Sequence, residues 1–267
     1  FSPTDASTTF TTNTFNTSQN LTWTSSTGAC AGSTAEINAY FNQPNTSNLS
    51  DLQASTSWLW GGLTNNEYTE ANNWYKWDGF KWLRETSSTP GNTDKIYVQS
   101  NNESGLCVSE SSSLTISSNI ESLFISNESS ANISGDINLS GDINNNGILN
   151  ASSGSLTING LNDQELNGTG STTLNNLIIN KNSGNFIMNA PLSVIDNLNL
   201  VSGNIQNGNH ILTIGSSSAS EGSITHNDGR IIGKLRRYFG NGNGEVLFPI
   251  GDDSNTRKVS IDIQGSP

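Results

Sequence analysis

The chain of 267 residues can form one large domain or two smaller ones, and it combines 32% hydrophobic with only 13% charged residues. Its formal net charge of −12 excludes nucleic acid as a partner, because phosphate binding needs clustered Lys and Arg. Membrane insertion is not expected either, since the sequence holds no run of about 18 apolar residues. The apolar residues are few but regularly placed, which favours a thin, repetitive core over disorder.

The N-terminal part, up to about residue 55, is rich in Ser, Thr and Asn and predicts short strands and loops. The stretch TAEINAYF at Thr34–Phe41 is the one segment that fits a helical turn. The chain opens with FSPTDASTTF, which has no basic and apolar leader pattern, so a secreted form would already have lost its signal peptide. An oxidising compartment would allow a disulfide between the two cysteines, Cys30 and Cys107, and a reducing one would leave two buried thiols.

Residues 56–100 hold five of the six tryptophans. The segment YKWDGFKW places Asp78-Gly79 between alternating aromatic residues, which predicts a hairpin with a two-residue turn. Trp77, Phe80 and Trp82 on this hairpin could stack on sugar rings, and they are the candidate ligand-binding residues. The alternative, which we favour, is that they form a hydrophobic plug at the end of the following domain. Residues 1–95 are thus expected to form an N-terminal β module or cap.

From about residue 96 to 232 the sequence becomes repetitive. Leu156, Leu177 and Leu198 are 21 residues apart, and Leu166 and Ile187 keep the same interval. Short strands with apolar residues two apart recur, namely Leu114/Ile116, Leu123/Ile125, Ile137/Leu139, Leu156/Ile158, Leu177/Ile179, Leu198/Leu200 and Leu212/Ile214. This pattern predicts an all-β fold, a right-handed parallel β-helix in which each repeat forms one coil. An antiparallel β-sandwich is the alternative, disfavoured because hairpin turns are lacking between these strands.

The C-terminal region differs in being rich in basic residues. Strands are expected at Gly229–Phe239, Glu245–Ile250 and Lys258–Ile263, separated by Gly-rich turns. Residues 233–267 are therefore predicted to form a hairpin-like β cap, which a solenoid needs over its last coil, or to open a further module.

A catalytic constellation is not visible in the sequence, so the protein is not expected to be an enzyme. A β-helical polysaccharide lyase or hydrolase would need paired carboxylates or a basic residue beside an acidic cluster. Asp136 and Asp142 are isolated and fit solvated corner residues better than a catalytic pair. No metal or other cofactor is expected from His210 and His226, although Asp136/Asp142 and Asp252-Asp253 could hold structural calcium.

The pattern of Trp58, Trp60, Asn73-Trp74, Gly79 and Pro90 resembles a module of repetitive extracellular adhesins of Bacteroidota, which the type IX secretion system exports. The stretch TTLNNLIINKNSGNFIMNAPLSVIDNLNLVSGNIQNGNHILTIG is similar to their β-helical coils, and GRIIGKLRRYF to the element that follows them. The resemblance implies a cell-surface adhesin or stalk segment whose partners are surface glycans or surface proteins, besides the secretion machinery. A structural filament or surface-layer component is the alternative, followed by a polysaccharide-degrading enzyme.

Overall fold

The computed structural model describes residues 17–24, 34–41, 56–62, 64–78, 82–99, 113–240, 244–252 and 254–263, the first two ranges by their backbone only. Strands β1 (Thr17–Thr24) and β2 (Thr34–Phe41) form a separate antiparallel pair in which Thr24 lies opposite Thr34. The helical turn expected at Thr34–Phe41 is therefore wrong. Ala35, Ile37 and Ala39 alternate with polar residues at the period of a strand, and that signal outweighs the weak helical one.

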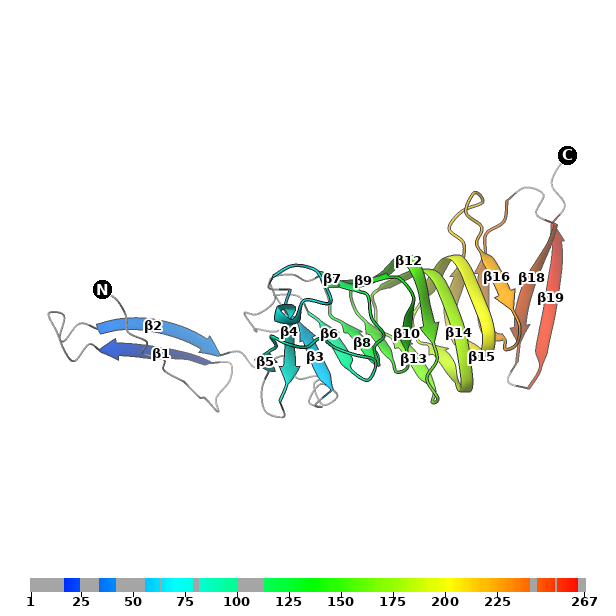
Figure 1. Cartoon of the computed structure of the whole chain (residues 1–267). Helices are drawn as coiled ribbons and strands as arrows, with labels where there is room; N and C mark the ends of the chain where they lie inside the picture. The colour runs from blue at the N-terminus through cyan, green and yellow to red at the C-terminus, as the bar shows by residue number, and fades with distance from the viewer. Residues whose placement is uncertain are drawn as a thin grey trace.

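The remaining strands belong to one sheet that winds into a parallel β-helix of about six turns, as Figure 1 shows. The predicted fold is confirmed, and the antiparallel sandwich is wrong for this region, because successive coils pair in parallel. Each full coil contributes one strand segment to each of three walls, which we call faces A, B and C.

The faces are defined by their strands. Face A contains β3 (Ser57–Trp60), β6 (Lys95–Val98), β8 (Ser122–Ile125), β11 (Ile143–Asn145) and β13 (Gln164–Asn167). Face B contains β7 (Ser113–Ile116), β9 (Ser130–Ser134) and the first half of β12 (Ile148–Ile158). Face C contains β10 (Ile137–Leu139), the second half of β12 and β16 (Ser223–His226). The long strands β14 (Ser171–Met188), β15 (Leu192–Ile214) and β17 (Ile231–Arg237) bend round the corners and contribute to more than one face.

The core is a set of aliphatic columns that run from coil to coil. On face C, Leu156 pairs with Leu177 and Leu177 with Leu198, so the predicted 21-residue interval is confirmed there. On face A the prediction fails by one residue, because Leu166 pairs with Met188 rather than with Ile187. Met188 is buried and Ile187 faces outward, since a shift of one residue turns a strand side chain to the other face.

An aromatic cluster closes the first coil. β3 pairs in parallel with β6, upstream of the expected start at residue 96, and antiparallel with β4 (Trp74–Trp77), which follows the short 3-10 helix η2 (Ala71–Asn73). The fully buried residues Trp58, Trp60, Tyr68 and Trp74 form what we call the end plug. Trp74 packs edge-to-face on Trp60, with ring centroids 5.0 Å apart, and its indole nitrogen donates to the Tyr68 carbonyl at 2.8 Å.

An antiparallel hairpin follows the last coil, in the region where the sequence predicts either a cap or the start of a further module. β18 (Gly244–Gly251) meets β17 in parallel at Ile231 and Ile250, and β19 (Thr256–Ile263) then pairs antiparallel with β18. Arg237 pairs with the buried Ile214 at the end of an aliphatic column, and its guanidinium donates to the Leu247 carbonyl at 2.8 Å. Burial lowers the pKa of Arg237, against the opposing effect of Glu221. A charged side chain thus ends the apolar column where the hairpin begins.

Candidate functional site

The aromatic hairpin predicted as a ligand-binding site has a different turn from the expected one. β4 pairs with β5 (Trp82–Arg84) so that Trp77 lies opposite Trp82, which leaves four residues in the connection. The predicted two-residue turn at Asp78-Gly79 is therefore wrong. Trp77 and Trp82 form a T-shaped pair with centroids 5.3 Å apart, and both are partly buried. Phe80, the third candidate residue, lies outside the described residues.

The end plug is built by other residues than the predicted ones. Trp77 and Trp82 lie across the sheet from the plug, because side chains alternate along β4 and Trp74 points into the coil. Trp82 instead packs on a second cluster that includes Leu59 and Tyr97. The tryptophan pair therefore stays a candidate contact surface for ligands, and the closure of the coil is assigned to Trp58, Trp60, Tyr68 and Trp74.

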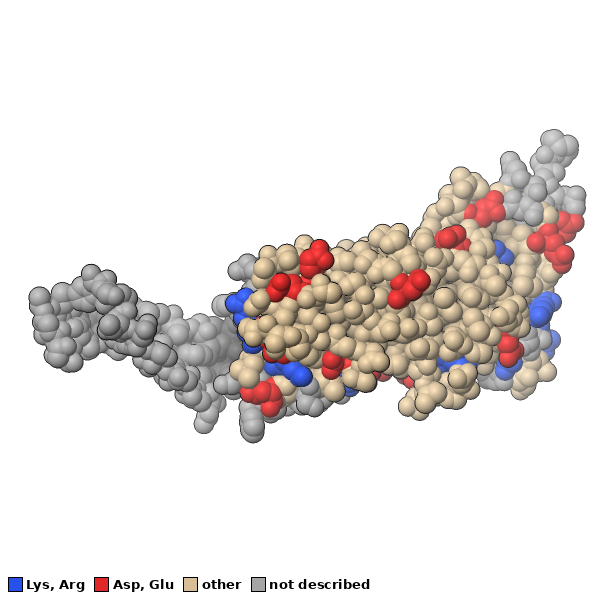
Figure 2. Space-filling view, in the orientation of Figure 1, with Lys and Arg blue, Asp and Glu red and all other residues tan. Residues whose placement is uncertain are grey.

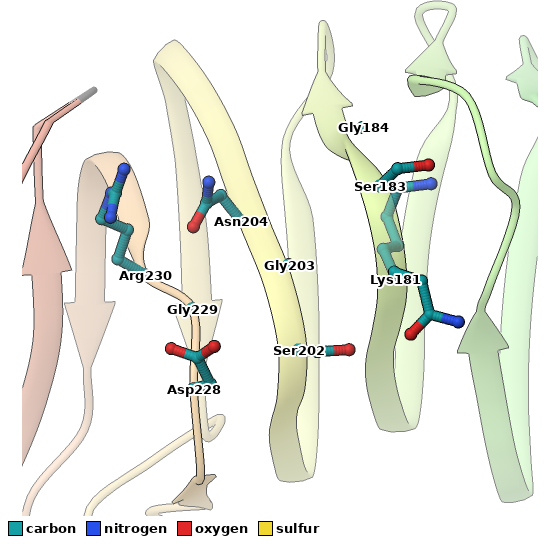
Figure 3. A pocket seen from close by; sticks show the side chains of 10 residues that line it. Lys181, Ser183, Gly184, Ser202, Gly203, Asn204, Asp228, Gly229 and Arg230 are labelled. Carbon is teal, nitrogen blue, oxygen red and sulfur yellow. The ribbon is translucent and has the colours of Figure 1, made fainter.

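A second candidate site, which the sequence did not point out, is a polar groove at the corner where face C turns into face A. It has a volume of about 370 Å³ and crosses three successive coils (Figure 3). We call it the corner groove, and its lining residues are Lys181, Asn182, Ser183, Gly184, Ser202, Gly203, Asn204, Asp228, Gly229 and Arg230. None of these residues is aromatic or aliphatic, so the surface of the groove is mostly polar and offers hydrogen bonds and charge.

Glycine allows the coils to stack closely at the corner groove. The three coils turn the corner with Ser183-Gly184-Asn185, Ser202-Gly203-Asn204 and Asp228-Gly229-Arg230. Gly203 has a φ of 89°, which L side chains rarely adopt, and a Cβ at Gly229 would clash with the Gly203 carbonyl. The coils can therefore stack closely only because these positions carry no side chain. The repeated Ser-Gly-Asn was the signal in the sequence that could have located the groove.

One rim of the corner groove is a row of polar residues on the face A side. The backbone N–H of Asn185 donates to the Asp163 carboxylate at 2.7 Å, and the Asn204 side chain donates to the Asn185 amide oxygen at 3.2 Å. Pairing of Ile205 with Ile231 puts Arg230 next in this row. These hydrogen bonds between coils hold the Asn204 amide at a fixed place beside the groove, while Ser183, Ser202 and Asp228 line the groove from the same three corners.

Lys181, in the first of the three coils, and Gln164, in the coil before it, fill the inner side of this corner. The Lys181 side chain is 2% exposed, and its ammonium donates to the Gly160 and Asn162 carbonyls and to the Gln164 amide oxygen at 2.7–2.8 Å. The Gln164 amide nitrogen in turn donates to the Leu139 and Gly141 carbonyls. Burial lowers the pKa of Lys181, and Asp163 and Asp142 oppose that shift. All three ammonium protons are thus donated to the wall of the solenoid.

The acidic residues singled out in the sequence are separated or occupied. Asp136 and Asp142 lie at opposite ends of β10, hence at different corners, and the Asp142 carboxylate accepts the N–H of Glu165 at 2.8 Å. Asp252 accepts from the N–H groups of Ser254 and Asn255 through one oxygen and pairs with Arg257 at 3.1 Å through the other. These donors lower the pKa of Asp252 to about 2. Its carboxylate is thus engaged by the protein's own donors, and Asp253 lies outside the described residues.

The histidines are likewise held by loop contacts or stand apart. His226 Nε2 lies 2.9 Å from the Gly229 carbonyl oxygen, beside the corner groove, while His210 lies at the next corner along the chain. In the described part of the chain, no three His, Cys, Asp or Glu side chains gather closely enough to hold a metal ion. Cys30 and Cys107 both fall outside the described residues, so the predicted disulfide stays a prediction.

The fold and the groove define the chain as a parallel β-solenoid with a polar corner site. Comparison with protein-family models, with curated proteins and with solved structures found nothing that matches it. Across the ranges that the structure describes, no helix has the length and apolar character needed to cross a membrane.

Proposed function

We propose that this chain is a non-catalytic segment of an extracellular adhesin, a β-solenoid that binds surface glycans at the corner groove. The observation that carries the proposal is the groove itself, a polar hollow that crosses three coils. Its lining offers hydroxyl, amide and backbone groups over a continuous length, and this is how a rigid scaffold contacts a polymer that lies along it.

The chemistry of the lining favours binding over cleavage. Glycoside hydrolysis uses two carboxyl groups that flank the scissile bond. Asp228 is the one carboxylate among the lining residues of the corner groove. Elimination would need a base that can take a proton, but the Lys181 ammonium is buried and donates three hydrogen bonds away from any substrate.

The location outside the cell is supported by the sequence. The aromatic module, the coils and the C-terminal element resemble those of adhesins that Bacteroidota export through the type IX system. The surface fits this assignment: Figure 2 shows isolated acidic residues separated by wide neutral areas. A net negative surface that is otherwise rich in Asn, Ser and Thr keeps a protein soluble without attracting polyanions.

A structural filament or surface-layer component is the second candidate, and one observation favours it. β19 is an edge strand whose Val259 and Ile261 are 41% and 45% exposed. Unpaired edge strands are templates for pairing with another chain. Stacking of coils end to end, however, is disfavoured, because the end plug and the C-terminal hairpin cover the two ends of the solenoid.

The test combines three measurements on the purified chain. A glycan array detects binding, an assay of newly formed chain ends detects cleavage, and sedimentation velocity detects assembly. We expect saturable binding to a subset of glycans with no new chain ends and no filaments. Cleavage of a bound glycan would overturn the non-catalytic assignment, and ordered assembly without glycan binding would favour the filament.

A further inference from the structure

We infer that the ligand of the corner groove is a neutral, hydroxyl-rich glycan chain that lies extended along the solenoid axis across three coils. This inference rests on the proposed function and names the class of glycan and the residues that contact it.

The repeat of the groove matches an extended polymer. Its three corners belong to neighbouring strands of one sheet, which are spaced about 4.8 Å apart. Ser183, Ser202 and Asp228 occupy equivalent positions before the three corner glycines. A β-linked glycan in an extended conformation advances by a comparable distance per sugar, so successive sugars meet successive corners.

The polar groups of the lining can both donate and accept hydrogen bonds. The Ser183 and Ser202 hydroxyl protons are already donated to the preceding coil, so their oxygens accept, while Asn182 and Asn204 carry amides that also donate. Sugar hydroxyl groups have the same dual character, so each can be satisfied here in either direction. The Asn204 amide is already oriented by its hydrogen bond to Asn185, which lowers the entropic cost of binding.

The charges disfavour an acidic polymer. Asp228 is exposed at the groove and offsets the charge of the partly buried Arg230, and Asp163 lies in the same row of side chains as Asn185 and Asn204. The Lys181 ammonium, which could attract carboxylates, is turned into the wall and is 2% exposed. The chain as a whole carries a net charge of −12, so its long-range field also repels polyanions.

The experiment measures the affinity of the full chain for two probes by isothermal titration calorimetry. One probe is a set of neutral β-1,4-linked oligosaccharides of two to eight sugars, and the other is an oligogalacturonate of the same lengths. We expect affinity for the neutral set to rise with length and level off once the three corners are spanned. The oligogalacturonate should bind at least tenfold more weakly.

The variant Ser202→Ala/Asn204→Ala removes the central contacts of the groove. Two lost hydrogen bonds should weaken neutral binding about tenfold or more. The matched control Ser193→Ala/Asn189→Ala removes the same two side-chain types outside the groove and should bind as the wild type does. Circular dichroism checks the fold, and Asn204→Ala alone replaces the double variant if the latter does not fold.

The outcomes separate the inference from the proposed function. Glycan binding that survives in the groove variant but is lost in Trp77→Ala/Trp82→Ala overturns the inference and the groove as the binding site, and leaves a glycan-binding adhesin with an aromatic site. Preference for oligogalacturonate overturns the assignment to neutral glycans. A folded chain that binds no glycan overturns both.

Discussion

The N-terminal end of the solenoid and its middle coils differ in the side chains that fill the interior. At the N-terminal end, Trp58, Trp60 and Trp74 fill the first coil with large rings that are fully buried. In the middle coils, Leu and Ile fill the interior, and the corner between faces C and A is left without side chains at its glycines. The first region closes the core from solvent, and the second leaves a hollow on the outside.

The two regions show that aromatic residues need not form the binding surface and that polar turn residues can do so. Aromatic residues in a β-solenoid suggest sugar stacking, yet here three of the five tryptophans between residues 56 and 100 close the first coil. The polar corner, which composition alone would assign to solvated turns, is where the chain offers a concave surface. Burial and shape, rather than residue type, decide which of the two regions can accept a ligand.

The largest loss of stability is expected from substitutions in the end plug. Trp74→Ala should lower the free energy of unfolding by about 3–5 kcal/mol, because it leaves a cavity among three other aromatic rings. The measurement is urea denaturation followed by far-ultraviolet circular dichroism. Trp82→Ala, at a partly buried position outside the plug, is the control and should cost clearly less. Equal losses would show that the two sites do not differ as the structure requires.

The next effect tests the register of face A. Met188→Ala should cost about 2–5 kcal/mol, because Met188 is buried in the column below Leu166. Ile187→Ala should cost less than about 1 kcal/mol, because Ile187 faces outward. Thermal and urea unfolding of the two variants provide the comparison. A larger loss at Ile187 would restore the interval predicted from the sequence and contradict the observed pairing.

A smaller loss of stability is expected from a substitution at the inner side of the corner between faces C and A. Lys181→Met should cost about 1–3 kcal/mol, because the two carbonyls and the Gln164 amide oxygen that the ammonium satisfies stay buried without a donor. Asn182→Ala, at the neighbouring exposed position, should have almost no effect. If Lys181→Met instead stabilised the chain, the cost of burying the charge would outweigh its three hydrogen bonds.

The smallest effect concerns the C-terminal hairpin and depends on pH. The pKa of Asp252 is lowered from 3.8 to about 2 in the folded chain, so the ionised carboxylate stabilises the fold above the unfolded-state value of 3.8. That contribution is lost as the pH falls through the range from 3.8 to 2. Unfolding measured between pH 2 and 6 should therefore show Asp252→Asn converging with the wild type at the acidic end. A stability difference that is independent of pH would contradict this assignment.

The sequence was sufficient to predict the solenoid because its signal is periodic and local. The spacing of Leu156, Leu177 and Leu198 reports the length of a coil directly, and the alternation of apolar residues reports a strand. The failures come where the period changes. The coil that joins Leu166 to Met188 has one residue more, which no local pattern reveals, and the turn after Trp77 is longer than its Asp-Gly suggests.

The candidate site was harder to predict than the fold. The corner groove depends on three glycines, Gly184, Gly203 and Gly229, that are brought together only by the stacking of coils of unequal length. Each tripeptide around them looks like an ordinary turn in the sequence. The burial of Lys181 could not be predicted either, since an isolated lysine among polar residues usually lies in solvent. The cluster of aromatic residues, in contrast, is evident in the sequence. Which of them are buried in the end plug and which lie on the surface is not.

The most direct test of the account is a crystal structure of the chain with a neutral oligosaccharide selected on the glycan array. We expect the sugar chain to lie in the corner groove, with hydrogen bonds to Ser202 and Asn204 and sugars along three successive coils. Electron density for a sugar stacked on Trp77 and Trp82, with the groove empty, would contradict it.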